Sequence, residues 1–150
     1  MALADNKRAK FDYEMVDEVE AGVEMTGFEV KAVKDGKVDI TGSHAIIRGG
    51  EAYIVGMKVQ SYQPGNEPEN FDTDRTRKLL LHREEIVKLA VKANERGLTI
   101  VPMRVYNKAG KVKVLLGLAK SKKKFDKREK IKKKDVQEDI ERNLKNKIRG

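Results

Sequence analysis

A Gly-Gly pair between two short apolar segments is the sequence feature that most restricts how this chain can fold. Gly49 and Gly50 separate residues 45–48 from residues 51–55. Two adjacent glycines accommodate the positive φ angles of a tight hairpin turn. We therefore predict an antiparallel hairpin here, with its pairing continuing through Val59, and hence a fold that contains a β-sheet.

A second hairpin is predicted nearer the C-terminus. Residues 98–106 and 111–119 are rich in β-branched and apolar side chains and flank a turn around residues 107–110. Pro102 has no backbone donor, so its strand is expected to lie at an edge or to be bulged there. Residues 19–25 alternate between apolar and acidic or small side chains, and this period of two predicts another half-buried strand.

Two helices are predicted between these strands. Thr26 and Glu29 have the spacing of a capping box, and Gly36 is placed to end the short helix that they begin. A helical apolar period from about residue 80 to residue 96 predicts a longer helix, with Gly97 as its C-cap.

The polar segment 61–76 contains two prolines and a glycine and predicts a long loop. The tally is about six short strands and two to three helices without βαβ alternation. The expected fold is mainly β, a closed or nearly closed barrel with flanking helices. By analogy with known RNA-binding domains of this size, the barrel would be of the oligonucleotide-binding (OB-fold) type.

Charge is distributed unevenly along the chain. Of 33 Lys and Arg and 24 Asp and Glu, 13 and 6 lie in residues 121–150, so residues 1–120 keep 20 basic and 18 acidic groups. We therefore expect a barrel domain of residues 1–120 and a basic tail of residues 121–150. The formal charge of +9 favours a polyanionic partner, because cationic side chains release the counterions condensed on phosphates. Charge alone does not separate nucleic acid from a membrane surface.

The tail has an apolar period of four. Val136, Ile140, Leu144 and Ile148 would lie along one side of a helix that Lys and Arg surround. A helix with so thin an apolar seam is marginal in water, so the tail is expected to be disordered or frayed when free and helical when bound. Two alternatives stay open: a solvated extension that only aids solubility, and a membrane-surface helix, which the narrow face without aromatic residues disfavours.

The motifs of catalysis are missing from the sequence. There are no cysteines, and the two histidines, His44 and His82, lie in different segments. No HExxH, P-loop or GxSxG pattern occurs, so we expect no enzyme, no metal and no cofactor. No apolar run reaches the roughly 20 residues that span a bilayer, and the N-terminus has no apolar signal segment. These features are typical of a cytoplasmic protein.

Basic residues lie next to aromatic residues at two places in the sequence. Looped RNA is held by cations that follow its phosphates and by flat side chains that stack on its bases, so these clusters favour RNA binding over catalysis. In the alternative interpretation, Phe11 and Tyr13 are core residues of a first strand. The clusters are Lys7, Arg8, Lys10, Phe11 and Tyr13, and Lys123, Lys124, Phe125, Lys127 and Arg128.

Several short stretches of the sequence together resemble the small protein B family. Each stretch alone is a weak signal, but they occur in the family's order and cover nearly the whole chain, so the joint match is specific. The stretches are NKRAKFDY (6–13), EAG (20–22), TGFEVK (26–31), GK (36–37), RTRKLLLH (75–82), KV (113–114), GLAK (117–120) and DKR (126–128).

The resemblance implies an OB-type barrel that binds the transfer-RNA-like domain of transfer-messenger RNA (tmRNA). The tail would enter the decoding site and the empty messenger channel of a stalled ribosome. The ribosome would then be rescued by trans-translation, and the nascent peptide tagged for degradation. Through tmRNA, elongation factor Tu and alanyl-tRNA synthetase would be further partners. The protein would act as a monomer without a membrane partner.

The resemblance also assigns residues to two binding surfaces. Glu20 is an acid in an otherwise cationic surface, where it could accept hydrogen bonds from base amino groups or orient nearby cations; alternatively it is an ordinary solvent-facing strand residue. The tmRNA surface would comprise Lys7, Arg8, Phe11, Glu20, Lys31, Lys37, Lys78, Asn94 and Lys113. The surface at the ribosomal decoding site would comprise Lys122, Lys123, Phe125, Asp126, Lys127, Arg128 and Lys134.

Three positions, Leu115, Ser121 and Val136, depart from the family's usual residues and leave the tail contacts open. Two other functions also stay open. The chain could be a generic basic barrel, such as a ribosomal or translation-factor subunit, that binds other RNA. It could instead be an RNA-modifying enzyme with a catalytic carboxylate such as Asp12 or Glu20.

Overall fold

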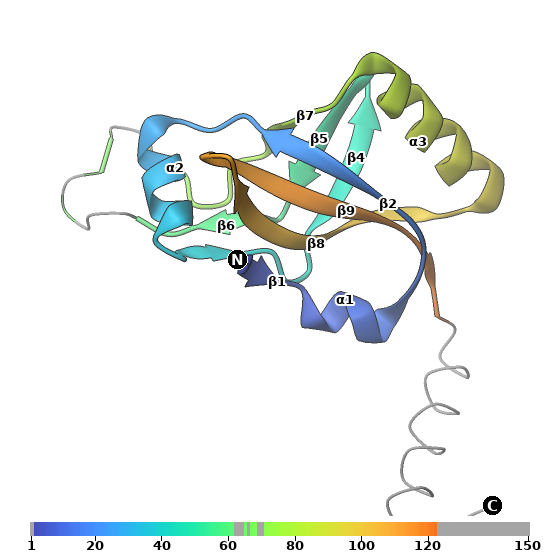
Figure 1. The fold of residues 1–150 in the computed structure, drawn as a ribbon, viewed down its shortest axis with the longest axis horizontal. Helices are drawn as coiled ribbons and strands as arrows, with labels where there is room; N and C mark the ends of the chain where they lie inside the picture. Colours follow the sequence, from blue (N-terminus) through green and yellow to red (C-terminus); the bar gives the residue numbers. More distant parts are fainter. Residues whose placement is uncertain (1, 62–64, 66, 69–70, 123–150) are drawn as a thin grey trace, which may run out of the picture. The chain divides into compact units, whose positions relative to one another are not determined.

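A sheet closed into a ring forms the centre of the protein (Figure 1). The computed structural model describes residues 2–61, 65, 67–68 and 71–122, and residues Met1–Lys120 form one compact unit. The strands of the main sheet have the order β1-β8-β4-β5-β7-β2-β9, and β9 also pairs with β8, which closes the ring. The strands are β1 (Ala2–Asp5), β2 (Tyr13–Val23), β4 (His44–Arg48), β5 (Glu51–Val55), β7 (Arg77–Leu80), β8 (Thr99–Lys108) and β9 (Lys111–Ser121).

The predicted mainly β barrel is confirmed. Its ring has six strands, and β1 pairs with the outside of the ring along β8. Alternate side chains of these strands point inward and pack into one apolar core, as period-two patterning requires. Fully buried members of this core include Ile54, Leu79, Val105, Val114 and Leu116.

Both predicted hairpins are confirmed. Gly49 and Gly50 have φ angles of 60° and 77°, as a two-residue turn between β4 and β5 requires. The β8–β9 pair turns at Ala109 and Gly110, and its register shifts between Pro102 and Arg104, so β8 is bulged where a proline cannot donate.

The predicted continuation of the first hairpin through Val59 is wrong. The chain leaves the main sheet after β5 and forms a short strand β6 (Lys58–Val59) that pairs with β3 (Val38–Asp39). Gly56 has a φ of 86° at this exit, so the backbone changes direction before the apolar period ends. The described residues of segment 61–76 contain no helix or strand, and its other residues lie outside the described part of the chain.

The helix that begins with a capping box is confirmed as α2 (Gly27–Lys34), and Gly36 follows its C-terminus with a φ of 80°. Helix α3 (Arg83–Arg96) ends at a left-handed Gly97 as predicted but begins later than predicted. Of the residues expected at its start, Leu80 ends β7 and His82 is the N-cap, so the helix itself begins at Arg83. Arg77 and Leu79 are buried while Lys78 and Leu80 are not, which is a strand pattern.

A helix that the sequence analysis did not predict, α1 (Lys7–Asp12), follows β1. Its N-cap is Asn6, a buried residue whose Oδ1 accepts from the Ala9 amide at 3.1 Å. The Asn6 amide nitrogen donates to the carbonyls of Pro102 at 2.9 Å and Ile40 at 3.3 Å. One side chain thus joins α1 to β8 and to the segment after β3.

We expect Asn6→Ala to lower the free energy of unfolding by about 2 to 4 kcal/mol, because it removes a helix cap and leaves two buried carbonyls without their donor. Denaturant unfolding followed by circular dichroism measures the change. Asn94→Ala on α3 makes the same substitution at an exposed position and is the matched control. Equal effects of the two variants would contradict this role for Asn6.

A buried ion cluster ties α2 to the start of β7. Arg77 is fully buried, its Nε donates to Glu29 Oε2 at 2.7 Å, and its Nη1 donates to the Met57 carbonyl at 2.8 Å. Arg75 Nη2 reaches the other Glu29 oxygen at 2.5 Å. Burial opposes ionisation of Glu29, but these arginines and the Thr26 amide outweigh it and lower the pKa of the Glu29 carboxyl. The interior of the protein therefore contains an ionised pair with its hydrogen bonds satisfied.

None of the helices among the described residues is both long and apolar enough to cross a membrane.

Candidate nucleic-acid interface

A groove on the outside of the barrel brings together Glu20, Lys78 and Lys113, three of the residues assigned to RNA contact. They come from β2, β7 and β9, which are neighbours in the sheet although distant in sequence. Lys78 lies between two buried residues of β7, and Lys113 between two buried residues of β9, so alternation directs both lysines outward. The other residues of the groove are Gly22, Glu51, Leu79, Leu80, Leu81, His82 and Glu85.

The floor of the groove is open because Gly22 has no side chain. Gly22 pairs with Leu80 across β2 and β7, and a Cβ atom on Gly22 would lie 3.2 Å from the Leu80 Cβ. Leu80 is 50% exposed. The groove therefore presents an apolar surface beside its charged residues, which suits the face of a base or a ribose better than a phosphate.

The Glu20 carboxylate is held in a hydrogen-bonded network. The Tyr106 hydroxyl donates to Glu20 Oε2, and the Lys108 ammonium lies 3.3 Å from both carboxylate oxygens. The hydrogen bond from Tyr106 is the largest of the effects that lower the pKa of the Glu20 carboxyl, and Lys108 and Lys113 add to it. Burial and the adjacent Glu20 raise the pKa of Tyr106 to about 12. At neutral pH, Glu20 is thus an acceptor and Tyr106 a donor.

The two other carboxylates of the groove also have partners within the protein. Lys78 Nζ lies 3.3 Å from Glu51 Oε2, and Glu85 Oε1 accepts from the His82 amide at 2.9 Å as part of the α3 cap. The groove has three carboxylates and two lysines along its walls. It is therefore close to neutral, unlike a groove that binds phosphates alone.

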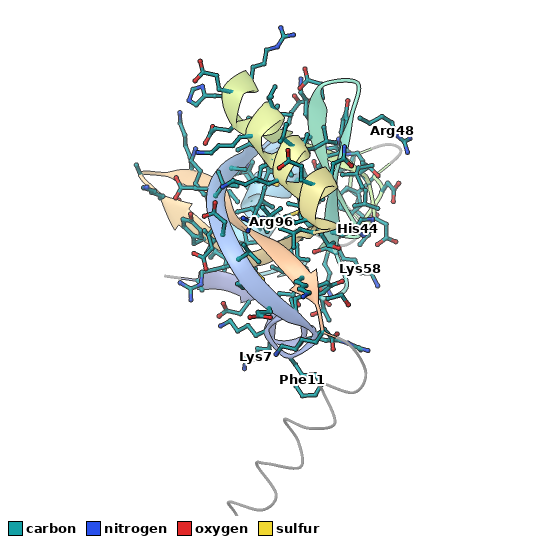
Figure 2. All side chains as sticks on the ribbon, turned by 90° about the vertical axis from the view of Figure 1, so that its right-hand side faces the viewer. Lys7, Phe11, His44, Arg48, Lys58 and Arg96 are labelled. Atoms are coloured by element: carbon teal, nitrogen blue, oxygen red, sulfur yellow. The ribbon has the colours of Figure 1, made fainter. Side chains whose placement is uncertain are left out.

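The other predicted RNA-contact residues lie outside this groove. Lys7, Arg8 and Phe11 are exposed on α1, where Figure 2 shows Lys7 and Phe11 at the end of the barrel that α1 covers. Arg8 Nε is 3.4 Å from Asp12 and lines a second hollow together with His44. Tyr13 instead packs against a small apolar cluster at the start of β2. The interpretation of a first strand is thus correct for Tyr13 and wrong for Phe11.

Three further predicted residues lie on two other helices or beside them. Lys31 is exposed on α2, and Lys37 follows α2 at 3.8 Å from Asp35. Asn94 is exposed on α3. Because α1, α2 and α3 lie at three separate places around the barrel (Figure 1), the nine residues form several patches and not one continuous site. Of the residues assigned to the decoding site, Lys122 is half-buried and the others lie outside the described residues.

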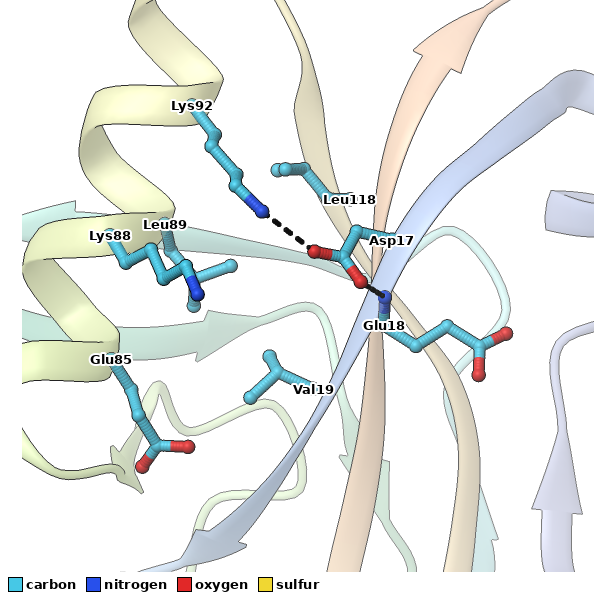
Figure 3. A pocket seen from close by; sticks show the side chains of 8 residues that line it. All are labelled: Asp17, Glu18, Val19, Glu85, Lys88, Leu89, Lys92 and Leu118. Carbon is cyan, nitrogen blue, oxygen red and sulfur yellow. Dashed lines mark hydrogen bonds and ion pairs between the residues drawn. The ribbon is translucent and has the colours of Figure 1, made fainter.

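A further hollow lies between β2 and α3 (Figure 3). Lys92 donates to Asp17 at 2.8 Å across it, and this hydrogen bond is the largest effect that lowers the pKa of the Asp17 carboxyl. Val19, Leu89 and Leu118 form the apolar part of its wall. The ion pair joins α3 to β2, and the lowered pKa makes the Asp17 carboxyl a poor general acid.

The proposed catalytic carboxylates show no feature of acid catalysis. Asp12 is paired with Arg8, and the lowered pKa of Glu20 makes it a poor proton donor. Within the described part of the chain, no cluster of three or more His, Asp or Glu could hold a metal ion.

Leu80, His82, Tyr106 and Lys108 are among the residues of this interface that were not assigned from the sequence. The first two lie beside Lys78 in the groove, and Tyr106 pairs directly with Lys113 across β8 and β9. Alternation in β8 does predict that Tyr106 faces outward. The position of Glu20 next to Tyr106 depends on the pairing of β2 with β9, and no local sequence pattern predicts that pairing.

Comparison with known proteins gives one consistent result. The sequence model of the family described as "SmpB protein" matches residues 3–146 of the chain. The SsrA-binding protein of Enterococcus faecalis is 45% identical over 144 residues, 96% of this chain and 93% of that protein. The SsrA-binding protein of Nostoc punctiforme is 43% identical, over 95% of this chain and 92% of that protein.

A solved structure shares the fold as well as the sequence. It was published as "tmRNA-SmpB: a journey to the center of the bacterial ribosome", and its matching chain has a TM-score of 0.68 and 42% sequence identity to this one. The match covers 85% of this chain and 92% of that chain.

Proposed function

Because this chain belongs to the SmpB protein family, we propose that it is the tmRNA-binding adaptor of trans-translation. The resemblance to small protein B found in the sequence is confirmed. The observation that carries the proposal is the groove that gathers Glu20, Lys78 and Lys113 from three strands, in a chain that matches SsrA-binding proteins over nearly its whole length. The family is one of RNA-binding adaptors and not of known enzymes, and we propose that this chain likewise performs no catalysis.

We propose a division of labour along the chain. Residues 1–120 bind the transfer-RNA-like domain of tmRNA through the groove and the basic side chains of α1 and α2. Residues 121–150 bind the decoding site and empty messenger channel of a stalled ribosome, through Lys122, Lys123, Phe125, Asp126, Lys127, Arg128 and Lys134. Messenger RNA already in the channel would compete for the same space, so the adaptor would bind only ribosomes whose messenger channel is empty.

Work on the ribosome would place the protein in the cytoplasm. Elongation factor Tu and alanyl-tRNA synthetase would associate with this protein through tmRNA, and not through a separate binding surface on the protein. The exposed basic residues of α1 suit this arrangement, because phosphate contacts position an RNA without reading its sequence, and the near-neutral groove then adds selectivity.

Competition binding tests the RNA partner. At physiological salt, we expect wild-type protein to prefer labelled tmRNA over bulk transfer RNA by about a hundredfold or more, because non-specific phosphate contacts are screened there. Glu20→Ala should lose most of this preference while retaining weak binding to both RNAs. Fluorescence anisotropy with unlabelled transfer RNA as competitor measures both quantities.

Lys58→Ala is the matched control, since it removes an exposed charge on β6, outside the groove. It should retain the preference for tmRNA. Equal competition by transfer RNA against wild-type protein would reject the tmRNA assignment in favour of a generic RNA-binding barrel. A covalent change in the RNA, detected by mass spectrometry after incubation, would favour an RNA-modifying enzyme.

A further inference from the structure

The network around Glu20 orients the carboxylate from one side. Tyr106 and Lys108 both come from β8, and Lys113 lies on β9 directly opposite Tyr106. A carboxylate can accept about four hydrogen bonds, so Tyr106 and Lys108 leave acceptor capacity on the Glu20 oxygens. Glu20 is itself a wall residue of the groove, so this remaining capacity is available to a ligand there.

The chemistry of the groove disfavours a simple phosphate site. With three carboxylates against two lysines, the groove has no excess of positive charge to hold a phosphate, whereas exposed Leu80 offers an apolar surface and Glu20 an acceptor. An RNA base has an apolar face and an edge that carries amino donors, and bases of single-stranded loops are free to present both. The combination fits a splayed-out base.

We infer that Tyr106 is a positioning residue that fixes the Glu20 carboxylate to accept a hydrogen bond from the exocyclic amino group of an unpaired RNA base in the groove. The inference rests on the proposed RNA-binding function and adds to it a selectivity element on β8. Tyr106 itself acts through Glu20, and Leu80 supports the face of the base. The phosphates are held elsewhere, by cations outside the groove such as those of α1.

Salt dependence separates this role from phosphate binding. Tyr106→Phe should weaken tmRNA binding about three- to tenfold at every salt concentration, the effect of losing one hydrogen bond that supports a charged acceptor. The slope of log affinity against log salt concentration should stay unchanged, because no phosphate contact is lost. Arg8→Gln on α1 should instead reduce the slope by about one.

Two further readouts test whether Tyr106 acts through Glu20. In combination with Glu20→Gln, Tyr106→Phe should cause no additional loss, because the acceptor that it positions is already gone. Removal of the Tyr106 hydrogen bond also raises the pKa of Glu20, so the variant should lose binding at a higher pH than wild type as the solution is acidified. A residue that merely supported the fold would move neither readout.

Lys58→Ala on β6, outside the groove, again serves as the control and should bind like wild type. Denaturant unfolding of Tyr106→Phe verifies that the variant is folded. If Tyr106→Phe binds tmRNA as tightly as wild type, the inference is wrong while the proposed function stands. The same holds if the loss of tmRNA affinity caused by Tyr106→Phe adds fully to the loss caused by Glu20→Gln. If wild-type protein shows no preference for tmRNA, both fail.

Discussion

Deletion of residues 123–150 should abolish the tagging of peptides on stalled ribosomes and leave the affinity for tmRNA unchanged. The cut falls after Lys122, so β9, which ends at Ser121, stays complete. The reason is the division of labour proposed above: the groove and the cations of α1 and α2 all precede the cut. An in vitro translation reaction with a stop-less message measures tagging, and fluorescence anisotropy measures the affinity.

A shuffled tail of identical composition is the control. It keeps the charge of residues 123–150 but destroys the Asp126-Lys127-Arg128 order and the apolar period of four. We expect it to be as inactive in tagging as the deletion. Tagging at the wild-type rate by the shuffled tail would support the solubility-extension alternative, and tagging by the deleted protein would refute the two-surface proposal altogether.

Arg77→Ala should lower the free energy of unfolding by about 3 to 5 kcal/mol, because it leaves a buried charge with only the more exposed Arg75 as its charged partner. The charge in question is the Glu29 carboxylate, which is almost completely buried. Such a loss is a large share of the total stability of a domain this size. Chemical denaturation at neutral pH gives the value directly.

Arg75→Ala is the matched control, because Arg75 binds the same carboxylate but its side chain is 39% exposed. Its loss should cost about 1 kcal/mol or less, as for an exposed ion pair. Equal losses of unfolding free energy for the two substitutions would contradict the claim that burial makes the Arg77 contact the more important one for stability.

The same cluster makes stability depend on pH. The folded-state pKa of Glu29 lies below its unfolded value, so the ionised pair stabilises the protein fully above the unfolded pKa. The contribution is lost as the pH falls through the lowered, folded-state pKa. The Arg75 hydrogen bond is the largest effect that lowers the pKa of the Glu29 carboxyl, and Arg77 adds its own hydrogen bond and charge, so Arg77→Ala should show a weaker acid dependence than wild type.

Elements with local signals could be predicted from the sequence. The turn at Gly49 and Gly50 and the cap formed by Thr26 and Glu29 each depend on contacts within a few residues, and both are present in the structure. Helix α1 has six residues and is too short to be stable by itself. Its cap residue Asn6 is held by carbonyls 34 and 96 residues away, contacts that no local pattern encodes.

The interface shows the same limit. Glu20, Lys78 and Lys113 were assigned by family resemblance, and their meeting in one groove depends on the strand order β7-β2-β9. Tyr106 and Lys108 carried no signal of their own, because a tyrosine and a lysine on an outward strand face are common. Their significance comes only from the hydrogen bonds that they donate to Glu20 on β2.

The buried Arg77 side chain also fixes the register of β7, that is, which of its residues face the interior. A slip of one residue would move Arg77 and Leu79 out to solvent and carry Lys78 and Leu80 into the interior, where Glu29 would lose its partner. The register of β7 is thus set by the burial of its own residues and not by the length of the segment that precedes it. We therefore expect a change in the length of segment 61–70 to leave Lys78 and Leu80 in place, so the groove would keep its geometry even when the chain just upstream of β7 is lengthened or shortened.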